Sequence, residues 1–485
     1  MIDLENIESY RENNRIEAKT ALGGLPHSIW ETYSAFANTM GGVILLGVRE
    51  EKDKSFHTVD LPDPEALVNE FWNSVNDPKT ASVNILSAKD VQISTIDGNR
   101  IIVINVPKAK RSFRPVYVEG NPLNTYRRTG EGDYKCTKEE YQAMVREASV
   151  FTQDMLLLEE MDINVINPEN LHEYRQKMKI LRPGHVFENL SDEEFLVKLG
   201  AAGIGEDGKT HPTGGGLLMF GNHYDIVRVY PYYFLDYRDY YAENTHWNER
   251  ITSSSGDWSG NLFDFYFRVS NMIQRNLRIP FSKKNGLCSE DDPVYMAVGE
   301  ALANSIVNAD YYGHGGIVVT KQKDRIRFSN PGGFRIDIET AISGGFSDPR
   351  NNIILNLFTM IGVGERSGSG IPNIFRVWRE NGWQEPEILQ TTEPNRTTLT
   401  LSFLPIVSEN LSEKSGRKNE SAIKQIKRQM IISYLTEHRK ASSSELSAYL
   451  NLSSSRVREY LRELMAENIV VAEGKNRNRK YRLKS

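Results

Sequence analysis

The sequence predicts a multidomain protein of the α/β (α+β) class, built from mixed blocks of strands and helices and a smaller C-terminal module. Its length of 485 residues is enough for about three or four domains. Hydrophobic residues make up 39% of the chain and charged residues 25%, proportions that are ordinary for globular proteins. Strand-like and helix-like patterns alternate over roughly the first 400 residues, and amphipathic helical segments follow a polar stretch.

The first segment, residues 1–150, is expected to be an α+β domain. Its patterns predict a helix over 3–13, a strand over 15–22, a helix over 27–40, strands over 43–48, 90–96 and 100–107, and a helix over 137–147. The pair Gly41-Gly42 is expected to end the second helix and to allow a tight entry to the strand that follows. Asn38 is assigned a structural part at the same helix end.

Four further segments follow along the chain. We expect an α/β connector over 151–285, an α/β sandwich over 286–407, a polar linker over 408–420, and a helical module with a hairpin over 421–485. Within the connector, the patterns predict a helix over 192–199 and a strand over 215–220.

Charge is distributed unevenly along the chain. The net charge is −5, yet residues 411–485 hold 17 basic and 8 acidic residues, or +9, which leaves −14 for the rest. A basic module on an acidic body points to a polyanionic partner at the C-terminal end. No apolar run reaches the roughly 18–20 residues of a membrane span, so no membrane partner is expected. The acidic N-terminus and two distant cysteines, Cys136 and Cys288, favour a cytoplasmic location.

Acidic residues gather around the first two predicted strands. Glu17 and Lys19 share one face of the first strand, Glu12 precedes that strand, and Glu50 follows the next one. Three carboxylates and a lysine could hold Mg²⁺ or Mn²⁺ and steady a phosphodiester, with the metal activating water. The alternative is a set of solvated surface glutamates beside a lysine.

Two sequence blocks in this segment resemble the Schlafen (AlbA-like) family. The short one is Glu12-x4-Glu17-Ala18-Lys19, and the long one, residues 34–48, reads SAFANTMGGVILLGV. The resemblance implies nucleic-acid binding. In the family's nucleases it also implies a catalytic, metal-binding acidic triad, which maps here to Glu12, Glu17 and Glu50. Two positions depart from that pattern, since Glu50 stands where those nucleases carry Asp and Ala18 replaces an aromatic residue.

Basic residues of the same segment are candidate phosphate contacts, because phosphate oxygens receive most of the hydrogen bonds in such complexes. They are Lys19, Arg111, Arg114, Arg127 and Arg128.

Residues 203–210, GIGEDGKT, match the phosphate-binding pattern G-x-x-x-x-G-K-[ST] literally. That loop works between a strand and a following helix, whose N-terminus then faces the phosphates. Here a predicted helix precedes the loop and a predicted strand follows it. We therefore expect a structural turn and not a nucleotide site.

The helix predicted over 292–310 carries Glu300 and Asn304 four residues apart, so both lie on one face. Such a pair suits a general base for water beside a Mg²⁺ ligand, and it fits a solvated helix face equally well. A glycine-rich stretch, residues 362–371, leads into a helix over 372–380. Glycines before a helix start can form a cradle for phosphate groups. Strands over 325–329 and 397–403 flank this stretch in the sequence.

The ordered set resembles the GHKL ATPase family, and more closely its divergent branch in RecG-related proteins. The matching blocks are Glu300–Tyr311, Ser329–Gly333, Arg350–Leu355 and Gly368–Ile371. The resemblance implies binding of ATP with Mg²⁺, with Glu300 as the catalytic base and Asn304 as the Mg²⁺ ligand.

The same resemblance assigns the remaining cofactor contacts. Asn330 would contact adenine, beside the turn at Gly332, and the lid around the phosphates would contain Gly362, Gly364, Gly368 and Gly370. Typical members carry Asp where Asn330 stands. Because the Asn amide is uncharged, weaker binding is expected, and hydrolysis is not implied.

The C-terminal segment predicts a winged helix-turn-helix. Its patterns give helices over 422–437, 446–450 and 456–467, with a cap at 442–445, and strands over 469–472 and 480–483. The third helix would enter the major groove and the basic wing would lie on phosphates, although such a fold also serves protein contacts. The candidate DNA contacts are Arg456, Arg458 and Arg462 on the helix and Lys475, Arg477, Arg479 and Lys480 on the wing.

Together these features predict an ATP-binding, DNA-binding transcriptional regulator of the Schlafen/RecG-related type, at least dimeric because winged-helix regulators often act on paired half-sites. The alternative is a Schlafen-type, metal-dependent endonuclease of RNA, tRNA or single-stranded nucleic acid in antiphage defence, with the GHKL-like module as a nucleotide sensor. A third hypothesis is a scaffold without activity.

Overall fold

The computed structural model describes residues 15–240, 247–276, 292–364, 368–392 and 394–406; beyond them it describes 427–428, 431–432, 434–435, 438–450, 454–467, 469–473 and 479–484. The helix expected over 3–13, Glu12, the linker over 408–420 and the wing residues Lys475 and Arg477 lie outside this part of the chain. The chain divides into two compact units, Met1–Leu156 and Leu157–Ser485, and each is described by itself.

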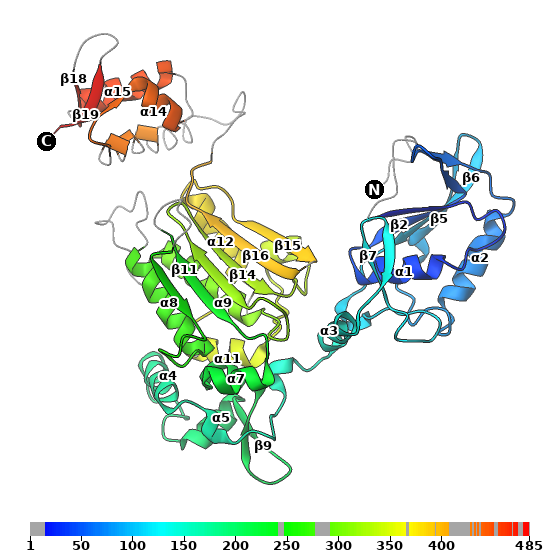
Figure 1. Cartoon of the computed structure of the whole chain (residues 1–485), viewed down its shortest axis with the longest axis horizontal. Coiled ribbons are helices and arrows are strands. Elements are labelled where there is room, and N and C mark those ends of the chain that lie inside the picture. Colours follow the sequence, from blue (N-terminus) through cyan, green and yellow to red (C-terminus); the bar gives the residue numbers. More distant parts are fainter. Residues whose placement is uncertain are drawn as a thin grey trace. The chain divides into compact units, whose positions relative to one another are not determined.

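The N-terminal unit is built on a four-stranded sheet in the order β1-β2-β6-β5 (Figure 1). Its strands are β1 (Ile16–Lys19), β2 (Gly42–Leu46), β5 (Val91–Ile96) and β6 (Asn99–Val106), and β1 runs parallel to β2. The predicted order of elements is thereby confirmed over this region.

Smaller elements complete the N-terminal unit. The helices are α1 (Ile29–Asn38), α2 (Pro64–Val75) and α3 (Lys138–Ala148). Short hairpins are formed by β3 (Val48–Glu50) with β4 (Phe56–Thr58) and by β7 (Tyr126–Thr129) with β8 (Gly132–Lys135).

The end of α1 explains the asparagine and glycines of the long sequence block. The Asn38 side-chain amide donates to the carbonyl oxygens of Val116 at 2.8 Å and Tyr126 at 3.0 Å, and its oxygen accepts from the Val116 N–H at 2.8 Å. At Gly41, which has φ +74°, a Cβ atom would lie 2.8 Å from the Val106 carbonyl oxygen. Asn38 therefore ties α1 to the segment before β7, and only glycine fits the close turn into β2.

The second unit contains a six-stranded mixed sheet in the order β12-β11-β13-β14-β16-β15. Its strands are β11 (Leu235–Asp239), β12 (Glu249–Thr252), β13 (Ile317–Lys321), β14 (Arg325–Pro331), β15 (Glu387–Thr392) and β16 (Asn395–Ser402). Helices α9 (Pro293–Val307) and α12 (Gly370–Glu380) pack against each other, and α9 packs on β14 (Figure 1). Alternate residues of β14, such as Ile326 and Phe328, are buried toward the core.

Other helices of this unit lie in the region expected to be a connector and in the nucleotide module. They are α4 (Pro168–Leu181), α5 (Asp192–Leu199), α6 (Gly214–Phe220), α7 (His223–Val229), α8 (Leu262–Asn276), α10 (Ile338–Ser343) and α11 (Asn352–Met360).

The expected boundary between residues 285 and 286 needs correction. Strand β11, from the segment expected to be a connector, pairs in parallel with β13 of the nucleotide module, with Leu235 opposite Ile317. One hydrophobic core extends from Met161 to Phe403. Residues 157–276 and the module therefore form one folded body, because neither part completes the sheet or the core alone.

The strand expected over 215–220 is wrong, because these residues form the helix α6. The Thr213 hydroxyl accepts from the Gly216 N–H at 3.1 Å and caps the helix start. All seven helical residues are buried, and a Cβ atom at Gly216 would lie 1.8 Å from the Ala201 carbonyl oxygen. A short apolar run without polar interruptions gives no period, so sequence cannot separate a buried helix from a buried strand.

The literal P-loop pattern forms the tip of a β-hairpin. Strand β9 (Ala202–Ile204) pairs antiparallel with β10 (Thr210–Pro212), and the Gly205 N–H donates to the Lys209 carbonyl oxygen at 2.9 Å. The Asp207 carboxylate accepts from the Lys209 N–H at 2.9 Å. The expectation of a structural turn is confirmed, since the motif runs from strand to strand.

The C-terminal part has the second and third helices and both strands of the predicted winged helix, whereas most of the helix expected over 422–437 lies outside the described residues. Its described elements are β17 (Ala441–Ser442), α14 (Ser443–Leu450), α15 (Ser454–Ala466), β18 (Val470–Glu473) and β19 (Lys480–Leu483), with the sheet order β17-β19-β18. The cap at Ser442 is reciprocal: the Glu445 side chain accepts from the Ser442 N–H at 2.6 Å, and the Ser442 hydroxyl accepts from the Glu445 N–H at 3.2 Å. None of the helices in the described parts has the length and apolar character that a membrane crossing requires.

Candidate nucleotide pocket and nucleic-acid interfaces

Helix α9 brings Glu300 and Asn304 to one face, as the four-residue spacing predicts. The Asn304 side-chain amide donates to the Glu300 carboxylate at 3.2 Å. One turn further, the Asn308 side chain donates to the Asn304 carbonyl oxygen at 3.0 Å. The helix therefore presents a row of polar groups with oxygen atoms that suit a divalent cation.

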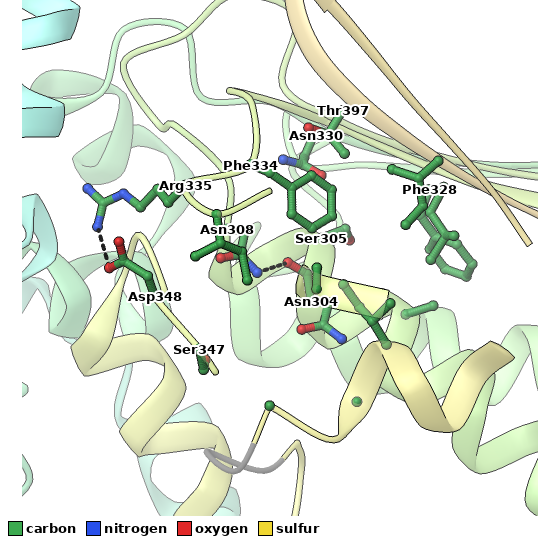
Figure 2. A pocket seen from close by; sticks show the side chains of 18 of the residues that line it. Asn304, Ser305, Asn308, Phe328, Asn330, Phe334, Arg335, Ser347, Asp348 and Thr397 are labelled. Carbon is green, nitrogen blue, oxygen red and sulfur yellow. Dashed lines mark hydrogen bonds and ion pairs between the residues drawn. The ribbon is translucent and has the colours of Figure 1, made fainter. Parts of the chain in front are cut away.

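A cleft opens between this face of α9, the sheet and the glycine-rich segment (Figure 2). Its cavity volume is about 110 Å³. The cleft is lined by five of the residues that the sequence singled out: Glu300, Asn304, Asn330, Gly368 and Gly370.

The remaining predicted glycines lie close to this cleft. Gly362 and Gly364 line an adjoining cavity that shares Glu300 and Gly370 with it. Gly332, with φ +90°, does not line the cleft. A Cβ atom there would lie 2.8 Å from the Arg350 guanidinium group. Gly332 thus allows the turn after Asn330 to pass a buried arginine.

Arg350 holds that turn against the end of α9. Its guanidinium group donates to the Gly333 carbonyl oxygen at 2.8 Å and also to the Asn308 carbonyl oxygen. The arginine is only 7% exposed. It satisfies carbonyl groups of two elements at once, which fixes the distance between the turn and α9.

Two buried polar residues of the cleft are Asn330 and Thr397. Asn330 is 5% exposed, and its amide nitrogen donates to the Pro331 carbonyl oxygen at 3.0 Å. The Thr397 hydroxyl donates to the Gly332 carbonyl oxygen at 2.8 Å. Both side chains are therefore anchored by backbone carbonyl groups at the cleft wall.

The glycine-rich segment approaches Glu300 closely. A Cβ atom at Gly370 would lie 2.1 Å from Glu300 Oε1, and one at Gly364 would lie 3.9 Å from Glu300 Oε2. A side chain at position 370 would therefore require the Glu300 carboxylate to move. Residues 365–367 of this segment lie outside the described residues.

Several lining residues were missed from the sequence. They are Ser305, Phe334, Arg335, Asp348 and Thr397. Phe334 and Arg335 directly follow the NPGG turn, so the turn itself was a signal for them. Asp348 and Thr397 come from distant segments that only the tertiary fold brings together.

In the N-terminal unit, Glu17 lies in an ion-pair cluster. Its carboxylate is 2.9 Å from Lys19 Nζ and 2.9 Å from the Arg128 guanidinium group. Arg128 is also 2.9 Å from the Asp133 carboxylate and lies over the Phe36 ring at 5.2 Å. With 1% of its side chain exposed, Arg128 cannot reach a phosphate on the surface, which corrects its assignment as a nucleic-acid contact.

Of the other two members of the acidic set, only Glu50 lies among the described residues. Glu50 contacts Lys54 at 3.5 Å, and its Oε1 atom is buried without a hydrogen-bond partner among the described residues. Glu12 lies outside the described residues. Within the described part of the chain, no group of three or more histidine, cysteine, aspartate or glutamate residues is arranged to hold a metal ion.

The remaining basic candidates of this unit take different positions. Arg111 donates to the Glu147 carbonyl oxygen at 2.9 Å and the Ser149 carbonyl oxygen at 3.2 Å, so it caps the end of α3. Arg127 pairs with Glu140 at 2.9 Å and keeps 28% of its side chain exposed. Arg114 is partly exposed, and Lys19 keeps 14% of its side chain exposed beside Glu17.

The winged-helix part exposes the basic residues of its third helix. Arg458 and Arg462 are exposed on α15, and Arg456 is 51% exposed while pairing with Glu459 at 3.2 Å. On the hairpin, Arg479 and Lys480 are exposed. The apolar residues Val457, Leu461 and Leu464 face the core, as the predicted periodicity requires.

Four protein families match separate parts of the chain. Residues 12–137 match the family described as Schlafen, AlbA_2, and residues 142–236 match a domain of unknown function, DUF8451. Residues 315–401 match the family described as putative ATP-dependent DNA helicase recG C-terminal. Residues 425–471 match winged helix-turn-helix DNA-binding. The third match begins after Asn304, so the place of Glu300 and Asn304 in the pocket rests on the geometry.

Two of the solved structures that are similar to this chain illustrate the match. The DIP2311 protein from Corynebacterium diphtheriae is 16% identical, with 97% of this chain and 95% of that one covered and a TM-score of 0.41. The N-terminal domain of a putative ATP-dependent DNA helicase RecG-related protein from Nitrosomonas europaea is 29% identical, with 28% of this chain and 90% of that one covered and a TM-score of 0.22. No curated protein matches the chain. The chain therefore combines a Schlafen AlbA_2 domain, an ATPase-like domain named for the C-terminus of RecG, and a winged helix-turn-helix DNA-binding domain.

Proposed function

We propose that the protein is an ATP-binding transcriptional regulator that binds DNA. The observation that carries the proposal is the single cleft shared by Glu300, Asn304, Asn330 and the two glycines Gly368 and Gly370. These residues come from three separate stretches of the sequence, and each has a chemical part in nucleotide binding. Such convergence of a few polar groups on one partly apolar pocket is typical of a ligand site.

The residues fit a nucleotide with a divalent cation. A Cβ atom at Gly370 would displace the Glu300 carboxylate, so the glycine leaves backbone close to the acid where phosphate groups need it. The Asn304 amide oxygen is a hard donor of the kind that Mg²⁺ takes, and bound Mg²⁺ would neutralise phosphate charge. Glu300 would orient or deprotonate water as a general base. Asn330 would accept from the adenine amino group through its amide oxygen.

The proposed function is nucleotide binding, and it does not require that the protein hydrolyse the nucleotide. The neutral Asn330 amide gives a weaker hydrogen bond than a carboxylate would. As a mechanism, nucleotide in the cleft alters the placement of the AlbA_2 domain and the winged helix, and DNA binding responds. Paired half-sites would call for at least a dimer.

Binding of ATP to the full chain, measured by calorimetry with Mg²⁺, tests the nucleotide site. Gly370→Ala should weaken ATP binding at least tenfold, because the new methyl group displaces Glu300 from its place. Gly23→Ala is the matched control, since no atom lies within 4 Å of a Cβ there. Equal affinity in the wild-type and Gly370→Ala proteins would contradict the proposed site. A gel-shift titration with duplex DNA, with and without ATP, tests the coupling.

The endonuclease is the second candidate, and one observation favours it: Glu50 Oε1 is buried without a hydrogen-bond partner among the described residues. The neighbouring Glu17 weakens the case, because Lys19 and Arg128 already compensate its charge. Incubation of tRNA or single-stranded DNA with Mn²⁺, beside a Glu17→Ala variant, separates the two candidates. Cleavage that the variant loses would establish the nuclease.

A further inference from the structure

Phe334 directly follows the NPGG turn, and its side chain projects into the nucleotide cleft. It is one of the cleft-lining residues, and Figure 2 shows its ring beside Asn330 and above Ser305. Part of the apolar surface of this ring is therefore open to the pocket.

The backbone on both sides of Phe334 is held in place. Before it, the Gly333 carbonyl oxygen accepts from the Arg350 guanidinium group at 2.8 Å. After it, Arg335 donates to the Pro349 carbonyl oxygen at 3.1 Å and lies 3.7 Å from the Asp348 carboxylate. The Arg335 side chain is only 5% exposed, so this anchor is itself buried. The ring of Phe334 is therefore presented from a fixed stretch of chain.

The ring has no aromatic partner within the described residues, whereas other large aromatic side chains of this unit pack ring against ring. Trp378, for example, lies 5.4 Å from Trp383 and 5.6 Å from Phe403. Phe334 is half-buried, and the apolar groups of the cleft around it include Ile371, Leu399 and two further phenylalanines, Phe328 and Phe346. One flat face is thus available to a flat ligand.

We propose that Phe334 is a base-stacking residue that makes the site selective for purine nucleotides. This inference rests on the proposed nucleotide binding. Aromatic rings prefer offset-stacked partners, and a bicyclic purine covers more of a phenyl ring than a pyrimidine does. Asn330 lies beside the ring, so one wall stacks on the base while the amide meets its edge. Phe334 thereby makes binding depend on the shape of the base, and the glycine segment binds the phosphates.

Equilibrium binding of three probes, each with Mg²⁺, tests the inference on the full chain: ATP, CTP and inorganic tripolyphosphate. The wild-type protein should bind ATP more tightly than CTP. The Phe334→Leu variant should bind ATP about tenfold more weakly, since stacking on an aromatic side chain accounts for a factor of that order. Its affinity for tripolyphosphate should be unchanged, which also shows that the variant is folded. Phe334→Tyr keeps the ring and should bind ATP like the wild-type protein.

Phe113 is the control, because it is 49% exposed in the N-terminal unit and does not line the cleft. Phe113→Leu should change ATP affinity little. The inference is overturned if Phe334→Leu leaves ATP affinity unchanged, if it weakens ATP and tripolyphosphate equally, or if ATP and CTP bind the wild-type protein equally well. If the wild-type protein binds tripolyphosphate and its affinity for neither nucleotide is higher, the site does not recognise the base. The proposed phosphate site is then still supported. If it binds none of the probes, the proposed function itself fails.

Discussion

The guanidinium group of Arg128 lies 2.9 Å from the Glu17 carboxylate, and it is buried with 1% of its side chain exposed. A second carboxylate, that of Asp133, lies at the same distance on its other side. The Arg128 group also donates to the Ile16 carbonyl oxygen at 3.3 Å. Arg128 therefore joins β1 to the β7–β8 hairpin in the N-terminal unit.

Replacing Arg128 with Met should destabilise the N-terminal unit by about 3–5 kcal/mol, because two carboxylates would lose the cation that compensates their burial. Hydrogen exchange of the full chain, read at residues 126–135, measures the effect locally. Arg49→Met is the control, since Arg49 pairs with Glu51 on the surface with 58% of its side chain exposed and such pairs contribute little. Equal exchange in both variants would show that the buried cluster is not what stabilises this unit.

His211 gives the β9–β10 hairpin a dependence on pH. One ring nitrogen lies 2.7 Å from the Met161 carbonyl oxygen and the other 2.9 Å from Asp207 Oδ1. The hydrogen bond to Asp207, followed by that to Met161, raises the pKa of His211, and the hydrogen bond from His211 lowers the pKa of Asp207.

Because the folded-state pKa of His211 is raised, its stabilising effect is complete below about pH 6.5 and is lost as pH rises through the folded pKa. The lowered pKa of Asp207 makes its effect complete above about pH 4 and lost at more acidic pH. His211→Asn should therefore lower the melting temperature of the second unit more at pH 5.5 than at pH 8.5. A difference that is the same at both values would argue against this pair, and His27→Asn, where the side chain is 80% exposed, serves as the control.

DNA binding by the winged helix should weaken steeply with salt, since cation release from phosphates drives it. Arg458→Ala and Arg462→Ala, both at exposed positions of α15, should each reduce affinity. A phosphate contact would lower the slope of log affinity against log salt by about 1, whereas a base contact would leave it unchanged. Arg379→Ala, on α12 and 65% exposed, is the control. A flat response of the wild-type protein to salt would exclude the DNA assignment.

The Cys136 thiol should react slowly with disulfide reagents in the folded protein. Burial, with a smaller effect of the Glu140 charge, raises the pKa of Cys136 to about 12, so little thiolate is present at pH 8. In a Cys288→Ser variant, labelling with a chromogenic disulfide should be slow in buffer and rapid in denaturant. Rapid labelling in buffer would mean that the loop around Cys136 opens readily.

Local patterns in the sequence were enough for most elements and for five of the residues that line the cleft. The spacing of Glu300 and Asn304 fixes their common helix face, and the NPGG turn marks the neighbouring cleft wall. By contrast, α6 was expected as a strand because seven buried residues in a row carry no period.

Long-range partners were beyond what the sequence could provide. Arg128 looks like a surface cation in the string Tyr126-Arg127-Arg128, and only the fold shows Glu17 and Asp133 beside it. Phe334 could not be placed in the cleft from the sequence for the same reason, because its position depends on the arginines that anchor its neighbours.

The parallel pairing of β11 with β13 makes the nucleotide module impossible to transplant as a cassette that begins at residue 286. In such a fragment, the inner edge of β13 would be exposed to solvent. The faces of α9 and α11 that residues from 157 onward now cover would be exposed as well. An exposed strand edge beside bare apolar surface invites association with other chains. A stable fragment of this unit should therefore begin near residue 157, whereas one that begins at residue 286 should aggregate.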